Sequence, residues 1–222
     1  MSNIHVWSSW LKTAEEMQRL SPEPLQFFCA IEMDARGLSV FEPLINRLQE
    51  INGEYWTYTF DDRRTSITTK NRIAHLNMGQ NLVSEFCTSD PSVNYLLFMA
   101  ADCMPPADAI PKLLELNHPL VGGEVTTYCL KGPVVSEFHP ISVQEHMATA
   151  AFIFIHRSVF KQLRWRSDPD LGMTDDPSYH YDAKTLLNIP TYVRKDVVGK
   201  HYPEAVGAIE TRGYDMKVVR DQ

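Results

Sequence analysis

The sequence lacks several features that would identify common classes of protein. Its four cysteines, Cys29, Cys87, Cys103 and Cys129, are widely spaced and form no Cys-x-x-Cys pair, which argues against a zinc site and a disulfide framework. No apolar run has the length of a membrane span, and the N-terminus has no basic-then-apolar signal pattern. We therefore expect a soluble, cytoplasmic protein with reduced, buried cysteines.

Positive charge and glycine-rich loops are also scarce. The chain has 21 Lys and Arg against 28 Asp and Glu, a formal net charge of -7. This balance argues against a general binder of nucleic acid or anionic membranes, which would normally carry a basic face. Neither a Walker-type loop nor a Gly-x-Gly-x-x-Gly fingerprint is present, so ATPase and dinucleotide-binding functions have little support.

What the chain does have is the composition of one globular domain and an alternating order of segments. It has 222 residues, of which 44% are hydrophobic and 22% charged. Apolar patterns predict strands at 25–33, 54–60 and 93–101, each followed by a helix, and further strands at 119–129, 147–157 and 191–202. A helix at 4–20 precedes them, and the segment 164–182 reads as a long loop or a short helix. This order predicts an α/β fold whose mixed, mainly parallel sheet is covered by helices on both faces.

Acidic residues follow the first three predicted strands. Glu32 and Asp34 end the first, Asp61 and Asp62 the second, and Asp102 the third. Ligands of open α/β sheets bind beyond the carboxyl ends of the strands, and carboxylates gathered there repel each other unless a cation compensates. Such oxygen ligands suit Mg²⁺ or Mn²⁺ together with substrate phosphate.

Further candidates lie late in the chain, where Asp175, Asp176 and His201 again come near the ends of ordered-looking segments. The pattern as a whole predicts a site for a metal-bound phosphorylated ligand with one acid or base.

Seven segments, in this order, resemble the GT-A glycosyltransferases of the family-two type. They cover roughly Phe27 to Tyr202 and read FCAIEMDAR, YTFDDRRTS, RIAHLNMGQ, YLLFMAADCMPPADAIPKLL, ATAAFIFIHRSVFKQL, TDDPSYHYDA and VRKDVVGKHY. The fourth is similar to the strand that carries the Asp-x-Asp metal motif of the family. Here the motif is degenerate, because Ala100 stands in place of the first acid, and Glu32 stands in place of the proline of the opening loop.

The resemblance implies a role for each matching residue. It implies a metal, Mn²⁺ or Mg²⁺, held by Asp102 and His201, and a catalytic base at Asp176 or its neighbour Asp175. Contacts to the nucleotide sugar are implied for Glu32, Asp34, Asp61, Asp62, Arg72, Asn77 and Ala101. The expected activity is inverting transfer of a sugar from a nucleotide-diphosphate donor to an acceptor hydroxyl.

The resemblance also implies a division of the chain. We expect a single GT-A-like domain over 1–222, with a helical extension at 1–24, a nucleotide-binding half at 25–116, an acceptor and catalytic half at 117–202 and a tail at 203–222. The acceptor stays open among glycans, proteins, lipids and modified nucleic acids, and a homo-oligomer is compatible with the sequence.

Each candidate residue also has an ordinary structural interpretation. Asp102 could cap a helix, although Asp108 suits that role better, and Asp175 with Asp176 could cap a helix whose first position is Pro177. His201 could be a structural histidine.

The remaining candidates have similar alternatives. Asp61 and Asp62 could form a solvated turn with neighbouring arginines, Arg72 could face solvent, and Asn77 could join its helix to a loop. Two aromatic residues, Trp165 and Tyr179, are expected to pack at the rim, and stacking on the acceptor is the alternative for them. At the level of function, a nucleotidyltransferase of similar fold and a non-catalytic nucleotide-sugar-binding protein stay open.

Overall fold

The computed structural model describes most of the chain. The described residues are 7–32, 41–58, 69–100, 103–131, 135–140, 148–149, 151–168, 170, 173 and 175–201. The helices are α1 (Trp7–Leu20), α2 (Glu42–Glu50), α3 (Thr69–Ser89), α4 (Ala109–Leu114), α5 (Arg157–Phe160) and α6 (Asp175–Leu187). The strands are β1 (Phe28–Glu32), β2 (Glu54–Tyr58), β3 (Tyr95–Met99), β4 (Cys103–Met104), β5 (Leu120–Lys131), β6 (Val135–Pro140), β7 (Phe152–His156) and β8 (Tyr192–His201).

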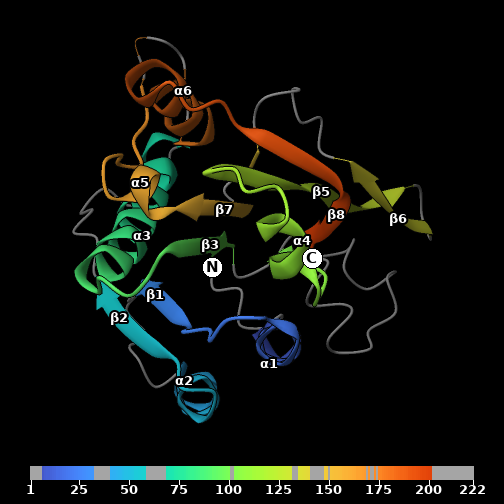
Figure 1. The fold of residues 1–222 in the computed structure, drawn as a ribbon. Coiled ribbons are helices and arrows are strands. Elements are labelled where there is room, and N and C mark those ends of the chain that lie inside the picture. Colours follow the sequence, from blue (N-terminus) through green and yellow to red (C-terminus); the bar gives the residue numbers. More distant parts are fainter. Residues whose placement is uncertain are drawn as a thin grey trace.

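The strands form two hydrogen-bonded groups (Figure 1). β1 and β2 pair in parallel, and the larger sheet has the order β3-β7-β5-β8-β4, with β6 paired to β5. Within the larger sheet β5 and β8 are parallel, whereas β3 with β7, β5 with β7, β5 with β6 and β4 with β8 are antiparallel. The mixed α/β architecture expected from the sequence is therefore confirmed. Most strand pairs of the larger sheet are antiparallel, so the pairing there is not mainly parallel.

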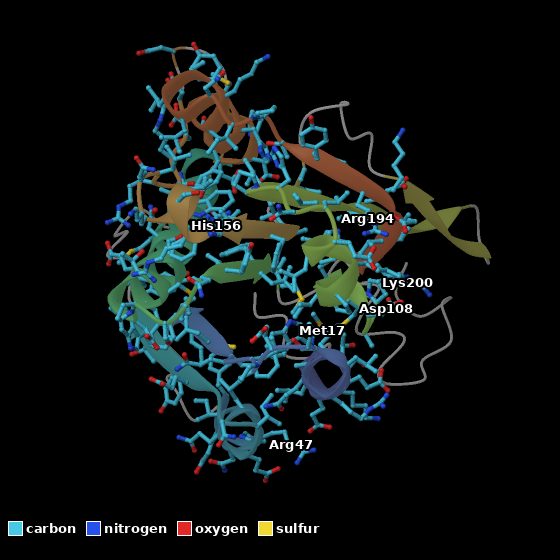
Figure 2. The ribbon with its side chains drawn as sticks, viewed as in Figure 1. Met17, Arg47, Asp108, His156, Arg194 and Lys200 are labelled. Carbon is cyan, nitrogen blue, oxygen red and sulfur yellow. The ribbon has the colours of Figure 1, made fainter. Side chains whose placement is uncertain are left out.

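Helices pack against both faces of the larger sheet because β7 is apolar on both sides. Ile153 and Ile155 belong to a buried cluster with residues of α3, α5 and α6. Phe152 and Phe154, which alternate with them, belong to a second cluster with residues of α1 and α4. Successive side chains of a strand point to opposite faces, so β7 forms the middle of two cores. Figure 2 labels Met17 of α1 in the second cluster, and His156 where β7 ends and α5 begins.

Two adjacent glycines, Gly122 and Gly123, allow neighbouring residues to pack very close to β5. A Cβ on Gly123 would lie 2.1 Å from Cε1 of Phe152, and a Cβ on Gly122 would lie 2.0 Å from Cβ of Ala148. These positions therefore exclude any larger side chain unless Phe152 and Ala148 move away. The strand continues through both glycines.

The pairing of β5 with β8 shifts register at the same place. Gly123 pairs with Arg194, while Glu124 pairs with Val198, so one step along β5 spans four along β8. Arg194 stabilises the irregular segment, donating from Nε to Asp196 Oδ1 at 2.9 Å and from Nη1 to Glu115 Oε2 at 2.8 Å. Val197 is buried within this segment. Such bulges change the direction and phase of a strand beyond them.

Two expectations about local structure differ from the fold. The polar segment 164–182 contains the first eight residues of α6, a helix of 13 residues rather than a loop or a short helix. Asp108 occupies the N-cap position of α4, yet its side chain makes no capping hydrogen bond and instead pairs with Lys112 at 2.7 Å. The tail at 203–222 lies outside the described residues.

Candidate functional site

The end of β8 lies beside the segment that follows β3. Cys103 pairs with His201, and Met104 pairs with Lys200, which Figure 2 labels near α4. Asp102 lies outside the described residues, but it is joined to Cys103 by one peptide bond. The two metal ligands expected from the resemblance therefore come from segments that pair directly.

A tight backbone arrangement precedes this pair. The N–H of Cys103 donates to the carbonyl of Ala100 at 3.0 Å, and the N–H of Ala100 donates to the carbonyl of Ala151 at 3.1 Å. The first bond spans Ala101 and Asp102, and the second joins the end of β3 to the start of β7. Within the described parts of the chain, no three His, Cys, Asp or Glu side chains form a group that could hold a metal ion.

The two candidate bases lie in the first turn of α6 and are half-buried. Gln80 of α3 donates from Nε2 to Oδ2 of Asp175 at 2.9 Å. This bond holds one oxygen of Asp175 against α3. The acids are inside the helix rather than before it, so they do not cap a helix that begins at Pro177, the structural alternative considered for them. Their charge is favourable there because the first turn of a helix carries partial positive charge.

The junction of α3 and α6 is polar and buried. Asn81 and the backbone of Trp165 exchange two hydrogen bonds of 2.9 Å, and the Trp165 ring stacks on Tyr179 with centroids 4.1 Å apart. Trp165 is 2% exposed and Tyr179 is fully buried, so the rim packing expected for them is wrong. Burial also raises the pKa of Tyr179, which keeps the phenol neutral.

Among the described residues, five buried polar atoms of α3, α6 and Trp165 have no hydrogen-bond partner. They are Asn77 Oδ1, Gln80 Oε1, Trp165 Nε1, Ser178 Oγ and Tyr179 Oη. The helix-to-loop bond considered for Asn77 is therefore not made through its carbonyl oxygen. Unpaired buried polar groups are unfavourable by about 1–3 kcal/mol each, which makes their concentration at one junction unusual.

Of the remaining candidates for the nucleotide-sugar site, Glu32, Arg72 and Asn77 lie on described elements. Glu32 ends β1 and pairs with Tyr58 at the end of β2. A Cβ on Gly79 would lie 2.9 Å from the Tyr58 hydroxyl, so the end of β2 packs on α3 two residues from Asn77. Arg72 lies on α3 as well. Asp34, Asp61, Asp62, Ala101 and Asp102 lie outside the described residues, as do the side chains of Glu32 and Arg72.

One residue of the site was not singled out from the sequence. His180 of α6 is 7% exposed, and both of its ring nitrogens have partners. Nδ1 lies 2.7 Å from Thr191 Oγ1, and Nε2 lies 2.5 Å from the carbonyl oxygen of Ala148. Burial lowers the pKa of His180 to about 4, although the bond to Ala148 acts in the opposite direction. The imidazole is therefore neutral at pH 7.

Neither a family model nor a curated protein sequence matches this chain significantly. Support for a function must therefore come from the residues and from the geometry given above. Among the described helices, none is both long enough and apolar enough to cross a membrane.

The arrangement has two chemical parts joined by backbone contacts. At one end, His201 of β8 pairs with Cys103, the residue that follows Asp102 in sequence. At the other end, α6 presents Asp175 and Asp176. An imidazole nitrogen and a carboxylate oxygen are donors that suit Mn²⁺ and leave most of the coordination shell to water and phosphate, so the donor set fits an open catalytic metal site.

Proposed function

We propose that the protein is a metal-dependent glycosyltransferase of the GT-A type, which moves a sugar from a nucleotide-diphosphate donor to an acceptor hydroxyl. The observation that carries the proposal is the pairing of Cys103 with His201. It supports a metal site shared by Asp102 and His201, which lie almost a hundred residues apart in sequence. The parallel pair β1–β2 followed by α3, and the parallel pair β5–β8, support the finer assignment of the fold.

Each end of the site has a distinct task in this reaction. Asp176 accepts the proton of the acceptor hydroxyl as its oxygen bonds to the anomeric carbon and the bond from that carbon to the diphosphate breaks. A single displacement of this kind inverts the anomeric configuration. Asp102 and His201 would hold Mn²⁺ or Mg²⁺, which would neutralise charge on the leaving diphosphate.

The hydrogen bond from Gln80 favours Asp176 over Asp175 as the base. Asp175 already accepts a bond at Oδ2 from a side chain that is 5% exposed. A carboxylate held in this way is suited to fixing the first turn of α6. We therefore assign Asp175 this structural role and Asp176 the role of the base.

The donor half of the proposal rests on the residues near the ends of β1 and β2. Glu32, Asp34, Asp61 and Asp62 contact the base and ribose, and Arg72, Asn77 and Ala101 complete the nucleotide-sugar site. The packing of Tyr58 on α3 at Gly79 supports this grouping, because it brings the end of β2 to the helix that carries Arg72 and Asn77.

The first experiment is a screen of nucleotide sugars for thermal shift and sugar release, with Mn²⁺, Mg²⁺ or EDTA. A donor that passes is used to compare Asp102→Asn and Asp176→Asn with the wild type. We expect Asp176→Asn to lower kcat by about 10²–10⁴-fold, and Asp102→Asn to lower activity and to raise the metal concentration required. Asp108→Asn is the matched control, because Asp108 follows Asp102 closely but pairs with Lys112.

The outcomes separate the three candidate functions. Metal-dependent turnover that survives both Asp102→Asn and Asp176→Asn would contradict the proposed roles. A nucleotide-sugar-dependent thermal shift without release or transfer would indicate a non-catalytic binding protein, an alternative that Ala100 at the first position of the metal motif keeps open. Pyrophosphate release from a nucleoside triphosphate and a sugar phosphate would indicate a nucleotidyltransferase.

A further inference from the structure

His180 links three segments that are distant in sequence. It lies on α6, its Nε2 partner Ala148 precedes β7, and its Nδ1 partner Thr191 precedes β8. Ala148 is 1% exposed and Thr191 is 3% exposed, so both contacts are shielded from water. Hydrogen bonds in such surroundings have no easy replacement by solvent.

The chemistry of the partners fixes the state of the ring. A carbonyl oxygen can only accept, so Nε2 carries the proton and donates to Ala148. Nδ1 then accepts from the hydroxyl of Thr191. A neutral imidazole thus satisfies both partners at once, and neither a second proton nor a second acceptor has a place in this arrangement.

Both partners lead to the opposite end of the candidate site. From Ala148 the chain passes through Thr149, whose Oγ1 accepts from Ala151 N–H at 2.9 Å, and Ala151 in turn accepts from Ala100 at 3.1 Å. From Thr191 the chain enters β8, which ends at His201. The contacts of His180 therefore connect α6 with both segments that lead to the expected metal ligands.

The position of His180 on α6 relates it to the candidate base. Residues four apart on an α-helix lie on the same face, one turn above the other, so Asp176 shares the face of His180. The rotation of α6 that brings the imidazole to Ala148 and Thr191 also sets the direction of Asp176.

We propose that His180 is a positioning residue, which fixes the rotation of α6 through Ala148 and Thr191 and thereby sets the direction of Asp176, the base of the proposed reaction. The effect on catalysis rests on the proposed glycosyltransferase function. The effect on α6 does not, and it is measured separately.

The test uses three substitutions of the contact and one control. Thr191→Val removes the hydroxyl that donates to His180 and keeps the shape of the side chain. His180→Gln keeps one donor and one acceptor, whereas His180→Leu removes both. Thr185→Val is the matched control, since Thr185 is an exposed threonine of α6 that bonds only locally to the Tyr181 carbonyl.

The first measurement is amide hydrogen exchange of peptides that cover α6. We expect Thr191→Val to speed exchange in the first turns of α6 by about tenfold, because one buried hydrogen bond is lost, with no change in Thr185→Val. His180→Leu is expected to do the same or to fold poorly, and His180→Gln to restore most of the protection. Unchanged exchange in Thr191→Val would overturn the proposal, whether or not the protein transfers sugar.

The second measurement separates positioning from simple stability. With a donor identified, Thr191→Val should lower kcat by about tenfold or more and leave the donor KM nearly unchanged, because a misdirected base affects the chemical step. Faster exchange in α6 with an unaltered kcat would overturn the role in aiming Asp176. Absence of any transferase activity would contradict the proposed function, and the exchange data would still decide whether His180 fixes α6.

Discussion

A buried neutral histidine has a consequence for stability that does not depend on any activity. The pKa of His180 falls from 6.5 to about 4 on folding, so between these pH values the unfolded chain binds a proton that the folded chain does not. The stability that this group contributes is complete above about pH 6.5 and is lost as pH falls toward 4.

This linkage predicts a difference between the wild type and His180→Gln. Between pH 7 and pH 4, the wild type should lose roughly 3 kcal/mol more of its free energy of unfolding than the variant, since glutamine does not titrate. Urea unfolding at a series of pH values measures both curves, and their difference removes the contribution of the carboxylates. Parallel curves would contradict the burial and pairing of His180.

Residue chemistry could be predicted from the sequence only where it is local. The acids that follow the predicted strands, and His201, could be chosen as candidates because strand ends can be located from apolar patterns, and their roles stay predictions. His180 was missed because its partners lie 32 and 11 residues away, and no spacing in the sequence connects them. Likewise, the burial of Trp165 and Tyr179 follows from their stacking on each other, which a polar, turn-rich segment conceals.

Among the elements, α6 shows why apolar periodicity can fail to predict a helix. Three of its buried residues are polar: Ser178, His180 and Asp182. Asp182 accepts two hydrogen bonds from Arg166, from Nε at 2.8 Å and from Nη2 at 2.9 Å, and His180 has the partners given above. Tertiary contacts therefore replace the apolar face that a sequence-based prediction relies on.

The C-terminal end of α3 depends on a single guanidinium. Arg157 donates to the carbonyls of Thr88 at 2.9 Å, Asp90 at 2.7 Å and Val93 at 2.8 Å, and also reaches Cys87. The last carbonyls of a helix have no partner within the helix. Arg157 supplies hydrogen-bond donors to these carbonyls of α3 and to carbonyls of the loop after it.

We expect Arg157→Lys to destabilise the protein by about 1–3 kcal/mol, because an ammonium group cannot reach all of these carbonyls in one plane. Arg164→Lys is the control: its ion pair with Glu85 is 3.6 Å long and exposed, so the change should be under about 1 kcal/mol. Equal midpoints of urea unfolding for the two variants would contradict the capping role of Arg157.

Across the whole molecule, the segments that form strands were easier to predict from the sequence than the directions in which those strands run. An apolar run such as β7 indicates a buried strand, but the same run fits either direction. β7 enters antiparallel between β3 and β5, and the short β4 pairs antiparallel with β8. The direction of a strand is decided by the connections between strands and by packing on both faces of the sheet. The sequence of a single segment does not encode either of these.

The closeness of β5 and β7 predicts strong intolerance at the glycine pair. Gly123→Val should destabilise the protein by about 1–3 kcal/mol or more, because its side chain would overlap Phe152 in the central core. Lys195→Val, an exposed change in β8, should have little effect. Thermal unfolding of the two variants gives the comparison, and a Gly123→Val protein as stable as the wild type would contradict the packing of β5 against β7.

The register shift between β5 and β8 makes the exact number of residues in β8 critical for the position of His201. Since one step of β5 spans four of β8, the strand carries three extra residues, an odd number, before it reaches Val198. Faces alternate along a strand, so an insertion or deletion of one residue at 195–197 would turn His201 to the other side of the sheet and shift it away from Cys103. The length of segment 195–197 therefore matters more for the position of His201 than the identity of exposed residues such as Lys195.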